Sequence, residues 1–158
     1  MADAPWLTPE RLGLTALLLE SHRRSFGRPL LAGHGPGRSR RLAAQELFAG
    51  AEVVLAHGGG RDPQLIYANG AALRLWRRPW GAMVGMPSRL TAEPQERNAR
   101  QRLLESALQL EAIRGYTGVR IDSHGRRFMI DNARLWTLWD EEGRGCGQAA
   151  AFSRWWWI

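Results

Sequence analysis

The chain has 158 residues, of which 44% are hydrophobic and 23% are charged. This length fits one domain with a core of its own, and the balance of residue types excludes a disordered chain. The first residues hold no basic segment, and the apolar stretch at residues 14–19 is too short for a signal core or a membrane span. We therefore expect a cytoplasmic protein without a membrane partner.

The net charge of +7 comes from 22 arginines, because the sequence contains no lysine, and 15 acidic residues lie among them. A complete lack of lysine is typical of the coding bias of a GC-rich genome. A nucleic-acid binder instead gathers its basic residues into a stripe or patch, so the composition disfavours nucleic acid as a partner. The single cysteine, Cys146, excludes an internal disulfide, and no Cys/His cluster has the spacing of a zinc site. We expect no metal.

The first 50 residues predict two helices. Thr8 followed by a proline is typical of a helix start, and the leucines after it form one apolar stripe as far as Gly27. Ser39 then caps a second, shorter helix that ends at Gly50. We interpret residues 1–50 as a helical extension that packs on the rest of the domain or dimerises it.

Residues 51–158 predict the core of the same single structural domain. Short β-type runs at residues 53–57 and 65–68 are followed by Asn69, which is well placed to cap a helix. The proline-containing segment 79–94 predicts short helical turns and loops.

Residues 96–112 then predict one long helix whose buried face carries Leu103, Leu104, Ala107 and Leu108. Three strands close the chain, at residues 116–122, 127–139 and 147–157. The predicted class is therefore α+β: a five-stranded antiparallel sheet with helices on one face, preceded by two N-terminal helices.

This order of elements is the order of a PAS domain, and residues 65–73 resemble the PAS signature in which a strand ends on Asn before a helix of small residues. A wider resemblance covers nearly the whole chain. It is carried by residues 54–58, 62–63, 67–69, 72–73 with 75–76, Trp80, 87–93, 116–121, 125–128, Trp136 and 147–152. On these segments the chain is similar to the MEKHLA domain family, which comprises small bacterial proteins and the C-terminal regions of plant class III homeodomain–leucine-zipper proteins. Ala56 departs from the expected serine, and the ending Trp155–Trp157 is unusually aromatic.

The resemblance implies a PAS-like fold with a sensory or protein-interaction role, and it implies no shared cofactor. Aromatic and polar residues fall on the elements that surround a PAS interior. The candidate pocket residues are Tyr67, Trp76, Trp80, Arg89, Arg120, Phe128, Trp136, Gln148 and Phe152. Aromatic walls with a few polar groups suit a small-molecule pocket, but they equally suit a filled core. The polar members have an alternative role in pairing with nearby carboxylates or carbonyls.

The sequence shows no catalytic constellation, so we expect no enzyme. His57 and His124 lie in or beside turns, without a nucleophile near them in sequence, and hydrogen bonding within the turn is the simpler role for each. His57 and Asn69 are noted as motif residues. The glycines 58–60 precede a strand rather than a helix, so they do not form a phosphate loop.

Two cofactors of PAS relatives are disfavoured. A covalent flavin adduct would need a cysteine within residues 83–94, and that segment has none. Haem binding would be expected to use a histidine on the long helix, and residues 96–112 contain none. Any cofactor therefore stays unknown.

The expected partners are a second copy of the chain and an unknown small molecule or protein. Strand alternation requires at least one tryptophan of Trp155–Trp157 to face outward, and exposed aromatic residues mark contact surfaces. The leading hypothesis is a PAS-like sensory or regulatory module. The alternatives are a protein-interaction module with a filled core, a small enzyme that uses His57 or His124, and a nucleic-acid binder.

Overall fold

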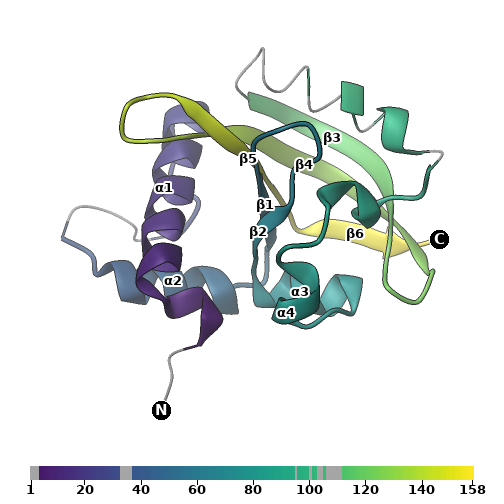
Figure 1. Ribbon diagram of the computed structural model, residues 1–158, viewed down its shortest axis with the longest axis horizontal. Coiled ribbons are helices and arrows are strands. Elements are labelled where there is room, and N and C mark those ends of the chain that lie inside the picture. The colour runs from purple at the N-terminus through teal and green to yellow at the C-terminus, as the bar shows by residue number, and fades with distance from the viewer. Residues whose placement is uncertain (1–3, 33–36, 95, 100, 103–104, 106–111) are drawn as a thin grey trace.

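In the computed structural model, the described part of the chain forms one antiparallel sheet of six strands with helices on both faces (Figure 1). The structure describes residues 4–32, 37–94, 96–99, 101–102, 105 and 112–158. The N-terminal elements are the 3-10 turn η1 (Pro5–Leu7) and the helices α1 (Pro9–Phe26) and α2 (Arg40–Ala49). The middle elements are β1 (Val53–Gly58), β2 (Leu65–Ala68), α3 (Gly70–Trp76), α4 (Trp80–Met83) and η2 (Ser88–Thr91). The C-terminal strands are β3 (Ala112–Ile121), β4 (Arg127–Trp139), β5 (Gly145–Phe152) and β6 (Arg154–Trp157).

Side-chain caps fix the starts of three of these helices, as the sequence predicts. Thr8, Ser39 and Asn69 each accept a hydrogen bond from the backbone N–H three residues further along. Each bond satisfies a donor that the first turn of a helix leaves without a partner. Gly27 ends α1 in the left-handed conformation, with φ 71°.

The strands follow the spatial order β2-β1-β5-β4-β3, and β6 also pairs with β4. The predicted last strand, residues 147–157, is interrupted at Ser153. On the two sides of this interruption, β5 and β6 pair with β4 in the same register. The interruption lies opposite Asn132, whose backbone has φ 56° and leaves the extended conformation. The local irregularity in β4 therefore divides one predicted strand into two.

Alternate residues of the strands face two separate apolar cores. The face toward α1 and α2, called the outer face, carries Val54, Ala56, Tyr67, Trp136, Leu138, Ala149 and Ala151. The opposite, inner face carries Val53, Leu65, Ile130, Ala133, Leu135 and Phe152, which pack with α3 and with Met83 of α4. Figure 1 shows α1 and α2 on one side of the strands and α3 and α4 on the other. The sequence predicted helices on one face of the sheet. In the structure helices cover both faces, with α1 and α2 on the outer face and α3 and α4 on the inner face.

Helix α1 is fastened to the outer face by polar contacts as well as by apolar packing. The indole N–H of Trp136 donates to the carbonyl oxygen of Leu18 at 3.3 Å, and the backbone N–H of Trp139 donates to the hydroxyl of Ser21 at 3.0 Å. The guanidinium of Arg24 lies 4.1 Å from the centre of the Trp139 ring. These contacts place α1 along β4.

One predicted boundary is wrong. Ala112, the predicted last residue of the long helix, is the first residue of β3. Residues 94, 96–99, 101–102 and 105 are helical. The predicted buried face of this helix, Leu103, Leu104, Ala107 and Leu108, lies outside the described residues.

The terminal tryptophans alternate as expected. Trp156 is 46% exposed, whereas Trp155 and Trp157 pack against the inner core. No helix in the described part of the chain has the length and apolar character to cross a bilayer.

Candidate functional site

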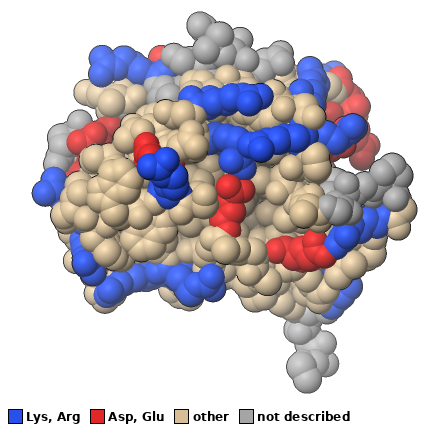
Figure 2. Space-filling model, turned by 180° about the vertical axis from the view of Figure 1, so that it is seen from behind, with Lys and Arg blue, Asp and Glu red and all other residues tan. Residues whose placement is uncertain are grey.

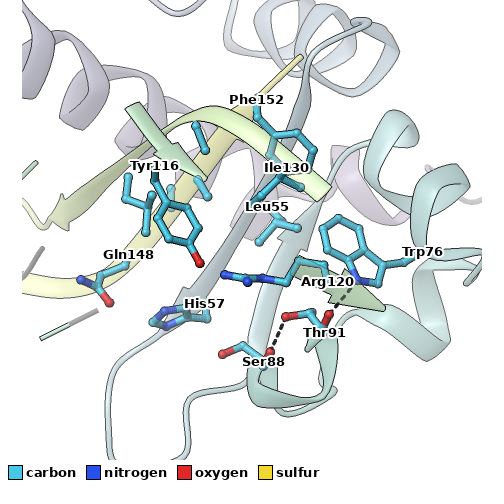
Figure 3. Close-up of a pocket in the computed structure, with 14 residues that line it drawn as sticks. Leu55, His57, Trp76, Ser88, Thr91, Tyr116, Arg120, Ile130, Gln148 and Phe152 are labelled. Atoms are coloured by element: carbon cyan, nitrogen blue, oxygen red, sulfur yellow. Dashed lines mark hydrogen bonds between the residues drawn. The ribbon is translucent and has the colours of Figure 1, made fainter. Parts of the chain in front are cut away.

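A cavity lies on the inner face of the sheet, between the strands and the segments α3 and η2 (Figure 3). Its walls are mostly apolar, with polar groups from several elements. The lining residues are Leu55, His57, Trp76, Ser88, Thr91, Tyr116, Arg120, Ile130, Ala133, Leu135, Gln148, Ala149, Ala150 and Phe152. Its volume is about 50 Å³, and one water needs roughly 10–15 Å³ on the same measure. The cavity therefore has room for more than one water but is small.

The charged group of the cavity is the guanidinium of Arg120 on β3. The residue is only 7% exposed. Its Nη1 donates to the carbonyl oxygen of Val119 at 2.8 Å, and its guanidinium lies 5.5 Å from the centre of the Tyr116 ring. Both side chains point into the cavity from the same strand (Figure 3).

Gly118 makes this arrangement possible. It lies between Tyr116 and Arg120 on the same face of β3, and a Cβ at Gly118 would overlap the Tyr116 hydroxyl. A side chain at this position would therefore displace the tyrosine ring from the cavity.

The opposite wall is formed where β1 pairs with β5. His57 and Gln148 are partners across this ladder, so their side chains leave the sheet on the same face. The Nδ1 atom of His57 lies 2.8 Å from the carbonyl oxygen of Gly58. Because a carbonyl only accepts, Nδ1 carries the proton in this contact.

The floor of the cavity is tied to the helical layer. The hydroxyl of Thr91 donates to the carbonyl oxygen of Ser88 at 2.8 Å, and the indole N–H of Trp76 lies 3.4 Å from the carbonyl oxygen of Thr91. These contacts join η2 to α3. A second, more open hollow adjoins the cavity, shares His57 and Gln148 with it, and is bordered by glycines 58–60.

The structure brings together only part of the predicted pocket. Trp76, Arg120, Gln148 and Phe152 line the cavity, and so does the motif residue His57. Sequence reasoning missed Tyr116, Ser88 and Thr91. The alternation of β3 carried a signal for Tyr116, because positions 116, 118 and 120 share one face of the strand.

The other predicted pocket residues lie elsewhere. Tyr67, Trp80 and Trp136 belong to the outer core, and burial raises the pKa of the Tyr67 hydroxyl. Phe128 lies behind Trp76, with ring centres 5.1 Å apart. The Nε atom of Arg89 lies 3.1 Å from a carboxylate oxygen of Asp62 in an exposed ion pair. Strand alternation directs Tyr67 and Trp136 to the outer face. Trp80 lies on α4 and packs against the outer core.

Asn69 has a structural position. Its side chain is completely buried and makes four hydrogen bonds. The amide donates to the carbonyl oxygens of Leu47 and Glu52, and Oδ1 accepts from the backbone N–H groups of Val54 and Ala72. Asn69 therefore joins α2, β1 and α3 without contributing to the cavity lining.

The remaining reactive groups lie away from the cavity or form no cluster. His124 is exposed in the β3–β4 turn. Cys146 is exposed near the start of β5, and partial desolvation of its thiol, followed by the charge of Asp140, raises its pKa. Among the described residues, no group of three or more His, Cys, Asp or Glu side chains is placed to hold a metal ion.

A family model described as "MEKHLA domain" matches residues 12–157. No curated protein matches the chain.

Solved structures with the same fold carry PAS and light-oxygen-voltage domains. The chain is similar to the PAS domain of a protein from Colwellia psychrerythraea, with 12% identity, a TM-score of 0.63, and coverage of 70% of this chain and 92% of that chain. It is also similar to an RNA-binding light-oxygen-voltage receptor, with 20% identity and a TM-score of 0.62 over 80% of this chain and 35% of the receptor. A light-oxygen-voltage domain studied with a flavin analogue has 14% identity and a TM-score of 0.57 over 77% of this chain and 86% of that chain. At these identities the likeness shows the fold alone.

The cavity does not fit a flavin. Its volume of about 50 Å³ is far below the roughly 300–1,000 Å³ of ordinary ligand and cofactor pockets. Cys146 is the single cysteine of the sequence, and it is not among the residues that line the cavity.

Proposed function

The chain belongs to the MEKHLA domain family, and from this premise we propose that it is a PAS-like sensory or regulatory module that binds a small molecule in the cavity. The observation that carries the proposal is the cavity itself. It lies inside the core, between the sheet and its helical cover, and combines apolar walls with the polar side chains of Arg120, Tyr116 and His57. A cavity with a few convergent polar groups is the usual form of a small-molecule site.

The strands offer a direct route from the cavity to the outer face. Leu135 of β4 lines the cavity, whereas its neighbour Trp136 bonds to α1 on the other side of the sheet. On β5, Gln148 lines the cavity on one face of the sheet, whereas Ala151 belongs to the outer core on the other. A ligand that shifts β4 against β5 therefore changes the surface on which α1 rests, which is a population shift between two packings.

The output would pass through contacts with a second copy of the chain or with another protein. Trp156 and Ile158 are 46% and 52% exposed, and both lie at the C-terminal end, on or beside β6. Large exposed apolar side chains are typical of contact surfaces. The proposal therefore includes a homodimer or a partner protein that contacts this end of the sheet.

Mass spectrometry under native and denaturing conditions tests the proposal. We expect a mass excess in the native protein, either retained from expression or added from a mixture of small metabolites, that disappears on denaturation. The native mass also reports whether the protein is a dimer. The cavity-filling variant Ala150→Leu should lose the excess, because Ala150 lines the cavity. The exposed residue Ala49, on α2, supplies the control Ala49→Leu, which should keep it.

A protein-interaction module with a filled core is the second candidate. The small cavity volume, about 50 Å³, together with the exposed Trp156, favours it. If neither the native protein nor the protein mixed with metabolites carries a ligand, this candidate replaces the first. Loss of dimerisation or partner capture in Trp156→Ala would then support it.

The proposal includes neither catalysis nor nucleic-acid binding. His57 is buried in the cavity wall, whereas His124 is exposed in a turn. On the face shown in Figure 2, some arginine side chains adjoin one another across the upper part and others lie singly, with acidic side chains beside them. RNA binding is named for one structural neighbour, and it is not carried over to this chain, because a likeness at 20% identity concerns the fold alone.

A further inference from the structure

Arg120 is a buried cation with little to balance it. Its guanidinium has five N–H donors, and the residue is 7% exposed. Its hydrogen bond goes to the carbonyl oxygen of Val119, its own neighbour in the strand, at 2.8 Å. No carboxylate among the described residues forms an ion pair with Arg120.

A buried charge without a counter-charge is costly, and buried arginines are ordinarily paired. The Tyr116 ring, with its centre 5.5 Å from the guanidinium, covers part of the group. In Figure 3 the guanidinium reaches across the cavity between the Tyr116 hydroxyl on one side and the Ser88–Thr91 turn on the other. Its donors therefore face the space that a ligand would occupy.

We infer that the cavity binds a short-chain monocarboxylate. The inference rests on the proposed function and names the ligand class of the same site. The two carboxylate oxygens match the planar fork of Arg120, and the Tyr116 hydroxyl is a further donor beside it. The hydrocarbon part of the ligand lies against Leu55, Ile130, Leu135 and Phe152, which form the apolar wall.

The lining also distinguishes a carboxylate from a phosphate. Among the described lining residues, Arg120 is the one arginine, and the larger charge of a phosphate is normally met by several cations or by a helix N-terminus. One guanidinium and one phenol suit a single negative charge.

The volume limits the length of the ligand. A cavity of about 50 Å³ exceeds the roughly 10–15 Å³ that one water needs but is far below the roughly 300–1,000 Å³ of ordinary ligand pockets, so it suits a ligand of only a few non-hydrogen atoms. Acetate and propionate are of this size, and benzoate exceeds it. Ligands this small bind with micromolar dissociation constants at best.

The test is a titration of the ¹⁵N-labelled full chain with acetate, propionate, benzoate and propionamide, followed by NMR. We expect saturable shifts of the Arg120 and Trp76 side-chain signals with propionate. Propionamide has the same shape without the charge, and its affinity should be lower than that of propionate by about tenfold or more. Benzoate should bind more weakly than propionate because of its size.

Arg120→Met keeps the apolar stem and removes the charge, so propionate affinity should fall about tenfold or more. Arg120→Lys keeps the charge without the planar fork, so its propionate affinity should lie between those of Arg120→Met and the parent chain. The matched control is Arg89→Met, since Arg89 is an exposed arginine outside the cavity. The propionate affinity of this variant should stay within about twofold of that of the parent chain. Denaturant unfolding of each variant establishes that it is folded at the titration temperature.

The possible failures are distinguishable. If propionamide binds as well as propionate and Arg120→Met leaves both affinities unchanged, the carboxylate inference is overturned while a ligand site remains. If acetate and propionate do not bind but the native protein carries another ligand, the ligand class is wrong and the sensory proposal stands. If the cavity takes no small molecule of any kind, both proposals fail. Marked unfolding of both Arg120 variants would assign Arg120 to stability as well, and the comparison of propionate with propionamide on the parent chain would then decide the inference.

Discussion

Asn69 shows how one side chain can hold three elements together. Its amide is buried and lies between α2, β1 and α3, with hydrogen-bond distances of 2.7 to 3.1 Å to its four backbone partners. Its Oδ1 caps α3, which supplies Trp76 to the cavity. A residue recognised from sequence as a helix cap therefore also fixes the position of the helical layer over the sheet.

Asn69→Ala should lower the free energy of unfolding by about 3–5 kcal/mol, because it leaves several buried backbone groups without partners at about 1–3 kcal/mol each. Urea unfolding at neutral pH measures the change. Asn98, exposed in the helical segment before β3, supplies the control Asn98→Ala, which should change the value by less than about 0.5 kcal/mol. Equal effects in the two variants would contradict the structural role of Asn69.

The contact between α1 and β4 depends on a neutral histidine. His22 is 1% exposed. Its Nδ1 lies 3.1 Å from the carbonyl oxygen of Arg28, and its Nε2 accepts from Nε of Arg134 at 3.2 Å. Both contacts require Nδ1 to carry the single proton. Burial, and after it the charge of Arg134, lowers the pKa of His22 from 6.5 to about 4.

This shift predicts that acid weakens the fold. Below the ordinary pKa of 6.5 the unfolded chain takes up the proton, whereas folded His22 stays neutral until about pH 4. The stabilisation from neutral His22 is therefore complete above pH 6.5 and is lost as the pH falls toward 4, by at most about 1.4 kcal/mol per pH unit.

Unfolding free energies measured between pH 7.5 and pH 4.5 give this slope. It should be smaller in His22→Gln, and it should persist in His124→Gln, since His124 is exposed. A slope that is unchanged in His22→Gln would assign the acid sensitivity to other groups.

At the scale of the whole molecule, the sheet separates two apolar cores. The inner core surrounds the cavity, and the outer core lies beneath α1 and α2. Val54, Trp136 and Leu138 are each at most 1% exposed on the outer face. We therefore expect the stability of the sheet and its solubility to depend on the N-terminal helices.

A chain shortened to residues 51–158 should expose this outer face and associate or aggregate, because the face would form a large apolar patch. Light scattering after size-exclusion chromatography measures the association. A chain that lacks only residues 1–4 is the control and should behave like the full chain. A stable monomer of residues 51–158 would contradict a requirement for the helical cover.

Much of the fold was available from local sequence signals. Capping residues predicted the starts of α1, α2 and α3, and period-two patterns predicted the strands, because caps and alternation act between residues close in sequence. The family resemblance then supplied the PAS-like fold, whereas the spatial order of the strands came from the structure. The predicted boundary at Ala112 failed, since helix and strand patterns overlap where apolar residues run together.

The sequence by itself determined the element order, the α+β class and the family of this protein. The tertiary structure decided which face of each strand meets the cavity. Trp136 was separated from the pocket and Tyr116 was brought into it, because facing depends on pairing register and not on composition. The structure also decided that Arg120 is buried without a described carboxylate partner. Burial and pairing arise from residues far apart in the chain, so the geometry of the site becomes visible only when the strands are assembled.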